Sequence, residues 1–346
     1  MEAFALTKQL VQQGLTEGAY PAAVLAVGVG ETLCALETYG DCREETLFDL
    51  ASVSKVVSAT MIALRFLEMG KIRLSDRVGQ FFPQAPADKR EITLQQLMTH
   101  TGGISPFFFL SKYAVDAAGA VDAILSYPLV ERPGQVPKYS CMGYILLGKI
   151  LEQVGQQPLD LLAQQWVFAP LGMTHTTYHP QGDTAPTEWN QATGQLLRGT
   201  VHDENARFLG GISGNAGVFS TIGDMARFAK MLALGGSLPG QPAFLAPQTL
   251  AAARKNDTPQ GPEYRGLGFH LAGSPGNFLG EEMSPQAFGH TGFTGTSFAI
   301  DPETGLWLVL LTNRICPTRD NLALIPLRRQ IHNAAATDCR RYLAEQ

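Results

Sequence analysis

Three short segments of the sequence combine residue types that can carry out acyl transfer. They are Ser52-Val53-Ser54-Lys55, Tyr139-Ser140-Cys141 and His290-Thr291-Gly292. A serine hydroxyl is a poor nucleophile at neutral pH and needs a neighbouring group that accepts its proton. Lys55 follows Ser52 by three positions, so a helix places both side chains on one face. The first segment therefore offers a nucleophile and a proton acceptor one turn apart.

The proton acceptor and its partner can be assigned from the same segments. A lysine in this role must be desolvated so that its pKa is lowered, and the residues around Lys55 are largely apolar. Tyr139 lies in a loop-like segment after Arg132-Pro133-Gly134 and before a helix. It could share the proton with Lys55 and hand it to the leaving group. By itself, Ser-x-x-Lys is a weak signal, because a helix-capping serine followed by a surface lysine has the same spacing.

The third segment lies in a run of small and polar residues, Gly289-His290-Thr291-Gly292-Phe293-Thr294-Gly295. We interpret it as the start of a strand at a sheet edge. Such an edge can direct backbone N–H groups at a bound carbonyl, while His290 and Thr291 contact a polar group of the substrate.

Hydrophobic periodicity predicts the elements that position these segments. The N-terminal part contains a helix over 3–14, a hairpin of strands over 22–28 and 32–39, and a helix over 52–68 that Gly70 ends. Helical patterns dominate 93–235, strands return over 264–271, 295–300 and 306–311, and a final helix covers about 321–344. Strands at both ends imply one sheet assembled from the two terminal segments. We expect a discontinuous α/β domain of residues 1–50 and 264–346, a mainly helical domain of 51–263, and the active site at their junction.

Composition excludes several classes of protein. The 346 residues are 45% apolar and 16% charged, with a net charge of −5, which excludes disorder, collagen and coiled coils. No basic cluster suggests a nucleic-acid or membrane partner. The longest apolar stretch near the N-terminus, residues 22–29, is too short to span a bilayer, and an acidic residue stands where a secretory signal is basic. Five cysteines without a Cys-x-x-Cys pair indicate free thiols. We therefore expect a cytoplasmic protein.

In their order, the three segments resemble the serine β-lactamase and penicillin-binding-protein superfamily, in particular its class C-related branch. That branch includes class C β-lactamases, D-alanyl-D-alanine carboxypeptidases, family VIII esterases, D-amino-acid peptidases and muropeptide amidases. The resemblance covers nearly the whole chain through FDLASVSK (48–55), LMTHTGG (97–103), YILLG (144–148), PLGM (170–173) and AGVFST (216–221). It implies a β-lactamase/transpeptidase-like fold, an antiparallel sheet flanked by helices with an inserted helical lobe.

The resemblance also implies roles for individual residues. Ser52 is the acylated nucleophile, Lys55 its proton acceptor and Tyr139 the second member of the proton relay. Backbone N–H groups of Ser52 and Phe293 form the oxyanion hole. Water then hydrolyses the acyl-enzyme, and no metal or organic cofactor takes part.

Two departures from the family pattern bear on the substrate-binding residues His290, Thr291, Gly292 and Cys141. Cys141 stands where many members have Asn, so it lacks an amide for binding an acylamino group. His290 stands where β-lactamases usually carry Lys, which weakens the hold on a penicillin carboxylate. Both changes argue against a dedicated β-lactamase.

These residues predict a serine hydrolase that acts on a small ester or amide. Cys141 favours an esterase, whereas His290 with Thr291 favours a peptidase or amidase acting on carboxylate-bearing D-amino-acid or cell-wall fragments. A true β-lactamase and a penicillin-binding sensor that acylates without turnover are the alternatives. An α/β-hydrolase is excluded because no serine lies in Gly-x-Ser-x-Gly. His202 can have either a substrate-contact or a structural role. The oligomeric state is left unassigned.

Overall fold

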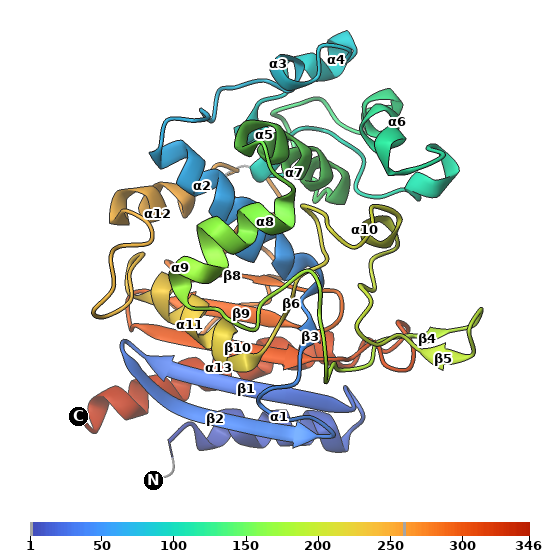
Figure 1. Cartoon of the computed structure of the whole chain (residues 1–346). Coiled ribbons are helices and arrows are strands. Elements are labelled where there is room, and N and C mark those ends of the chain that lie inside the picture. The colour runs from blue at the N-terminus through green and yellow to red at the C-terminus, as the bar shows by residue number, and fades with distance from the viewer. Residues whose placement is uncertain (1–2, 259–260) are drawn as a thin grey trace.

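The computed structural model describes residues 3–258 and 261–346 as a mixed α/β protein (Figure 1). Within these residues, the main sheet has six antiparallel strands in the order β2-β1-β10-β9-β8-β7. The N-terminal strand β1 pairs with β10, which confirms the prediction that both ends of the chain build one sheet. The strands are β1 (Ala22–Val29), β2 (Thr32–Gly40), β7 (His270–Leu271), β8 (Phe288–Thr291), β9 (Ser297–Asp301) and β10 (Leu306–Thr312).

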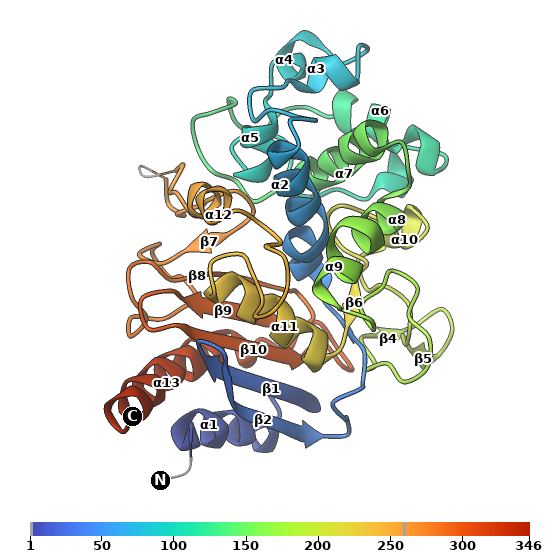
Figure 2. The same cartoon turned by 60° about the vertical axis from the view of Figure 1, so that its left-hand side comes forward.

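Helices cover both faces of this sheet (Figure 2). Helices α1 (Ala5–Thr16) and α13 (Leu324–Ala344) pack on one face, and α11 (Ile222–Ala233) packs on the other. Successive side chains of a strand point to opposite faces. In β1, Val24 and Ala26 join the core under α11, while Leu25 and Val27 join the core under α1 and α13. Burial on both faces explains why this strand is apolar throughout instead of alternating.

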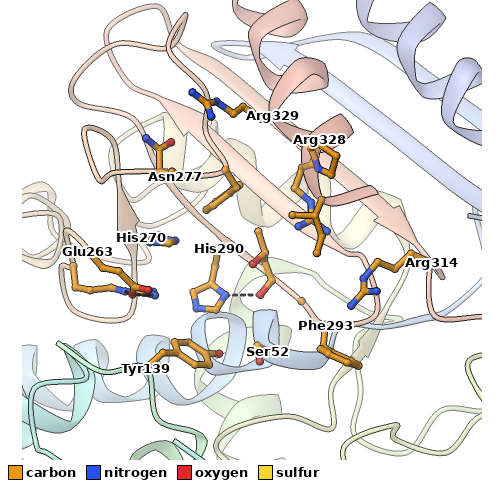
Figure 3. Close-up of a pocket in the computed structure, with 17 residues that line it drawn as sticks. Ser52, Tyr139, Glu263, His270, Asn277, His290, Phe293, Arg314, Arg328 and Arg329 are labelled. Atoms are coloured by element: carbon orange, nitrogen blue, oxygen red, sulfur yellow. Dashed lines mark hydrogen bonds and ion pairs between the residues drawn. The ribbon is translucent and has the colours of Figure 1, made fainter. Parts of the chain in front are cut away.

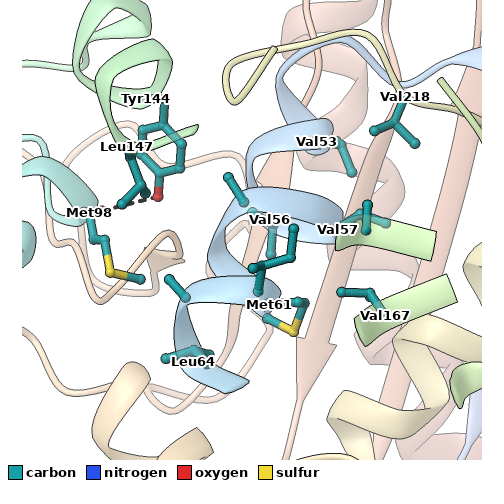
Figure 4. Close-up of a cluster of buried hydrophobic side chains, with 14 of the residues drawn as sticks. Val53, Val56, Val57, Met61, Leu64, Met98, Tyr144, Leu147, Val167 and Val218 are labelled. Atoms are coloured by element: carbon teal, nitrogen blue, oxygen red, sulfur yellow. Dashed lines mark hydrogen bonds between the residues drawn. The ribbon is translucent and has the colours of Figure 1, made fainter. Parts of the chain in front are cut away.

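A helical lobe stands above the sheet (Figure 1). It surrounds one central segment, residues 51–68, part of whose core is drawn in Figure 4. Side chains from several elements, including Met98, Tyr144 and Val167, pack around it. The helices of the lobe are α2 (Met61–Glu68), α3 (Val78–Phe81), α4 (Ala87–Arg90), α5 (Leu94–Met98), α6 (Ala120–Ser126), α7 (Cys141–Gly155), α8 (Leu159–Ala163), α9 (Ala169–Leu171), α10 (Glu204–Phe208) and α12 (Pro247–Ala253).

The central segment differs from the continuous α-helix that the periodicity predicts. It begins as a 3₁₀ turn (Ala51–Val53), continues as a π-helical turn (Lys55–Thr60) and becomes regular only in α2. Residues 53–64 are all buried, so packing from every side outweighs the local preference for an α-helix. Turns of this kind recur at functional sites.

The segment His290-Thr291-Gly292 also differs from its prediction. His290 and Thr291 end strand β8 instead of beginning a strand, and the residues after them turn into β9. The region 264–271 forms only the short strand β7. Two small sheets complete the structure: β3 (Phe48–Asp49) with β6 (Phe219–Ser220), and β4 (Trp189–Asn190) with β5 (Gln195–Leu196).

The boundaries of the two expected domains stay a prediction. Helix α11 belongs by sequence to the segment 51–263, yet it packs against the sheet. In the part of the chain that the structure describes, no helix is both long enough and apolar enough to cross a membrane.

Candidate active site

The position of Ser52 is set by the turn that follows strand β3. The carboxylate of Asp49 accepts the backbone N–H of Ala51 through Oδ1 at 2.8 Å and that of His202 through Oδ2 at 2.7 Å. Ala51 has φ +46°, a left-handed conformation that costs a non-glycine residue energy. The buried Asp49 therefore holds a strained turn that presents Ser52 to the adjoining cavity.

Ser52 and Lys55 are in direct contact. The Nζ of Lys55 lies 3.0 Å from the Oγ of Ser52 and also donates to the carbonyl oxygen of Asn215 at 2.9 Å. Ser52 lies in the 3₁₀ turn and Lys55 is the first residue of the π-helical turn that follows it. The two side chains therefore meet where these turns join, with Lys55 fully buried at 0% exposure.

The charge of Lys55 differs from the expectation. Burial lowers the pKa of Lys55, but the Coulombic attraction of Cys141 and Tyr139 outweighs burial and raises that pKa above its usual value. In the resting site Lys55 is therefore an ammonium group. One proton must leave the Lys55–Tyr139 pair before Ser52 can transfer its own.

The ring of Tyr139 packs between Lys55, Arg265 and His100. Its ring centroid lies 4.9 Å from the Nζ of Lys55, 5.3 Å from the guanidinium carbon of Arg265 and 4.5 Å from the His100 ring centroid. His100 also accepts the backbone N–H of Ser140 through Nδ1 at 3.0 Å. Burial raises the pKa of Tyr139 while Lys55 opposes the rise. Tyr139 lines the cavity next to Ser52, and its side chain interacts with both Lys55 and Ser52.

The backbone N–H groups of Ser52 and Phe293 are free of hydrogen bonds within the described residues. The two segments that carry them are tied together, because Thr294 donates its hydroxyl to the carbonyl oxygen of Asp49 at 2.7 Å. A Cβ on Gly292 would approach the Leu50 carbonyl oxygen to 2.5 Å, so only glycine allows this closeness. The two N–H groups therefore meet the needs of an oxyanion hole.

A cavity of about 630 Å³ adjoins Ser52 (Figure 3). His290 projects into it from the end of β8. The Nδ1 of His290 lies 2.8 Å from the carbonyl oxygen of Thr291 and must donate to it, since a carbonyl can only accept. Burial, with Arg265 and Lys55 nearby, lowers the pKa of His290 well below its usual value. His290 is therefore neutral at pH 7 and offers the cavity an acceptor, the buried and unpaired Nε2, instead of a positive charge.

Of the other candidate substrate-binding residues, two line the cavity and one does not. Thr291 and Gly292 line it together with His290. Cys141, the first residue of α7, instead points its Sγ at the Nζ of Lys55, 3.4 Å away, and is not part of the cavity wall. Cys141 thus contacts Lys55 and does not line the cavity.

His202 contacts the side chains of Glu188 and Phe293. Its Nε2 lies 3.0 Å from Glu188 Oε2, and its ring stacks on the Phe293 ring at 5.6 Å between centroids. Arg319 donates to Glu188 and Glu204 and also lies over Phe293. This network supports the side chain of Phe293, whose N–H is one of the two candidate oxyanion-hole donors.

The network predicts a pH-dependent contribution to stability. The hydrogen bonds from Arg319 lower the pKa of Glu188 from its ordinary 4.5 to about 2. A carboxyl group whose pKa is lower in the folded than in the unfolded state stabilises the fold at every pH above its unfolded-state pKa. For Glu188 this contribution is lost as the pH falls from 4.5 toward 2. In thermal melts, Glu188→Gln should therefore lower Tm at neutral pH and lose that deficit in acid. Glu303→Gln, at an exposed carboxylate, is the control; a Glu188→Gln deficit of constant size at every pH contradicts the prediction.

Several residues around the site carry no signal in the sequence. Asn215, Arg265, Arg314 and Arg328 belong to no recognisable segment, and they come together only because distant parts of the chain meet. A buried arginine cannot be distinguished from a surface arginine by residue type, so no local pattern could have found them.

Comparisons with known proteins show the family and the fold of the chain. The profile of the family described as Beta-lactamase matches residues 7–333. The chain is 32% identical to a protein of Escherichia coli K12 named "Putative D-alanyl-D-alanine carboxypeptidase", over 78% of this chain and 69% of that protein. It is 29% identical to the N-acetylmuramyl-L-alanine amidase of Bacillus subtilis 168, over 88% and 80%. The solved structure of EstCE1, a hydrolase with promiscuous acyltransferase activity, superposes with a TM-score of 0.76 at 22% identity, over 95% and 97%, which shows the shared fold.

Proposed function

Because the chain belongs to the Beta-lactamase family and is a serine hydrolase of that family, we propose that it hydrolyses a small amide or ester through an acyl-enzyme on Ser52. The observation that carries this proposal is the 3.0 Å contact between Lys55 Nζ and Ser52 Oγ beside a cavity that Tyr139 also lines. The nucleophile, the proton acceptor and the second relay member then act on one bound carbonyl.

In the proposed acylation step, the Lys55–Tyr139 pair has first lost one proton to solvent. Ser52 Oγ then attacks the substrate carbonyl while its own proton passes to that pair. The negative charge that develops on the carbonyl oxygen is stabilised by the N–H groups of Ser52 and Phe293, an effect of about 3–4 kcal/mol per donor in other hydrolases. Tyr139 donates the proton to the leaving group as the bond to the carbonyl carbon breaks. Water then attacks the ester, its proton enters the same pair, and Ser52 regains its hydroxyl proton.

We propose an amide or peptide derived from D-amino acids or cell-wall fragments as the substrate. The support is that two relatives over most of the chain are named as a carboxypeptidase and an amidase. A short-chain ester is the second candidate, and the position of Cys141 favours it. Cys141 faces Lys55, so no side-chain amide at this position contacts an acylamino group.

The proposal is tested by following intact protein mass and free drug together after benzylpenicillin is added. We expect a long-lived adduct on the wild type and none on Ser52→Ala, because acylation needs the hydroxyl and deacylation of this bulky acyl group is slow. Rapid drug loss without an adduct supports a true β-lactamase instead. A stoichiometric adduct combined with no turnover of p-nitrophenyl acetate or a D-amino-acid amide supports a sensor. Equal labelling of Ser52→Ala contradicts the assignment of the nucleophile.

We also propose a cytoplasmic location. All five cysteines are free thiols in the structure, as is usual in a reducing compartment. Fractionation of cells that express the full-length protein tests this location.

A further inference from the structure

A buried arginine lies over the ring of Tyr139 in the wall of the cavity. Arg265 is only 4% exposed, and its guanidinium carbon lies 5.3 Å from the centroid of the Tyr139 ring. The Nζ of Lys55 lies 4.9 Å from the same centroid. Two cations therefore act on one tyrosine, and burial strengthens the electrostatic effect of both.

The backbone of Arg265 and one carboxylate hold the guanidinium group in this position. The N–H of Arg265 donates to Thr258 Oγ1 at 2.8 Å, and its carbonyl oxygen accepts the N–H of Asp257 at 2.9 Å. Its Nε donates to Glu263 Oε2 at 2.9 Å, and Nη2 donates to the same oxygen. The Glu263 side chain is 38% exposed, against 5% for that of Arg265. Solvent therefore screens the carboxylate more than it screens the guanidinium.

Three histidines near Arg265 add no charge to the site: His100, His270 and His290. Burial lowers the pKa of each of them, and the charge of Arg265 lowers it further. All three side chains are therefore neutral at pH 7. The charge of Arg265 thus acts on the groups around it although Glu263 is bound to it.

The other titratable groups around the Lys55–Tyr139 pair are acids or lie across the cavity. The acids are Cys141 and Tyr144 of α7, Asp203 before α10, and Glu263. Arg314 and Arg328 line the cavity on the side away from Tyr139 (Figure 3). Within the described residues, only Lys55 and Arg265 place a cation over the Tyr139 ring.

The charge of the Lys55–Tyr139 pair changes when the pair is activated. An ammonium group on Lys55 and a neutral Tyr139 together carry one positive charge, which is lost with the first proton. A neighbouring cation repels the charged form and therefore favours loss of that proton. We propose that Arg265 is a positioning residue of the proton relay, whose charge promotes loss of the first proton from the pair so that Ser52 reacts at a lower pH. This inference rests on the proposed function, because it concerns the same relay.

The rate at which a fluorophosphonate labels Ser52 tests the proposal. Ser52 Oγ bonds to phosphorus, fluoride leaves, and the serine proton passes to the Lys55–Tyr139 pair, so the probe needs neither the natural substrate nor deacylation. Intact protein mass gives the rate constant. At neutral pH we expect Arg265→Gln to react about tenfold or more slowly, because a lost neighbouring charge shifts a pKa by about one unit or more. Arg265→Lys keeps the charge and should stay within about threefold of the wild type.

Glu263→Gln should react faster than the wild type. It removes the negative charge that partly neutralises Arg265, while the amide oxygen still accepts from Arg265 Nε. A merely structural role of the ion pair predicts the opposite, since loosening it from either side would slow the reaction. The rise of the labelling rate with pH should lie at higher pH in Arg265→Gln and at lower pH in Glu263→Gln.

Arg65→Gln is the matched control. Arg65 lies over the Phe244 ring at 5.5 Å and pairs with Glu68 at 3.3 Å, but it does not line the cavity. Its variant should label Ser52 at the wild-type rate. Thermal melts show whether each variant is folded, and Glu263→Gln decides the question if Arg265→Gln is not.

The outcomes separate this inference from the proposed function. A Glu263→Gln rate that does not exceed that of the wild type overturns the role of Arg265, and so does an undiminished rate in folded Arg265→Gln. Equal labelling of Ser52→Ala and the wild type, or no labelling of the wild type, instead contradicts the nucleophile on which both rest.

Discussion

Replacing Ser52 with alanine should lower kcat/KM by about 10⁴-fold or more, as loss of the nucleophile does in other serine hydrolases. The Ser52 hydroxyl contacts Lys55 Nζ, and Lys55 keeps its bond to the Asn215 carbonyl in the variant. The variant therefore loses no structural contact that the fold depends on. We expect its Tm to stay close to that of the wild type.

The measurement is steady-state turnover of p-nitrophenyl acetate and of a D-amino-acid amide by purified wild type and variant. Ser54→Ala is the matched control, because Ser54 belongs to the same segment but accepts the backbone N–H of Val218 at 3.1 Å. It should cost about 1 kcal/mol of stability and leave the chemical step in place. Wild-type turnover by Ser52→Ala on either substrate refutes the acyl-enzyme at this residue.

Replacing Lys55 with methionine should lower kcat/KM by about 10³–10⁴-fold, the range reported for loss of a general acid or base. The 3.0 Å contact with Ser52 Oγ makes Lys55 the nearest group that can receive the serine proton. Methionine fills a similar volume at this fully buried position, and it removes a charge that no carboxylate pairs with among the described residues. The loss should therefore appear in the rate and not in the Tm.

Two further measurements separate a catalytic role of Lys55 from a structural one. Lys89→Met, at a buried lysine that pairs with Asp88 outside the cavity, should retain turnover. Because the pKa of Lys55 is raised, kcat/KM of the wild type should rise with pH as the Lys55–Tyr139 pair loses its first proton. This rise should change in Lys55→Met. An unchanged rate with an unchanged pH profile contradicts the assigned role.

The sequence by itself indicated the candidate reacting groups and most of the elements. Ser52, Lys55, Tyr139 and the His290 segment were identified by residue type, order and spacing, because an acyl-transfer site needs those functional groups. The hairpin, the helical region 93–235 and α13 were predicted because apolar residues recur along them at the period of a strand or a helix. Such signals lie within a few neighbouring residues.

Tertiary structure alone decided the geometry and the charges of the site. The 3₁₀ and π-helical turns around Lys55 replaced the predicted regular helix, because packing from all sides outweighs local preference. The raised pKa of Lys55 and the lowered pKa of His290 depend on groups that are far away in the sequence. Arg314 and Arg328 line one cavity only because the end of β10 and helix α13 border it. Burial and the distance between charges are properties of the folded chain, so residue type and spacing do not reveal them.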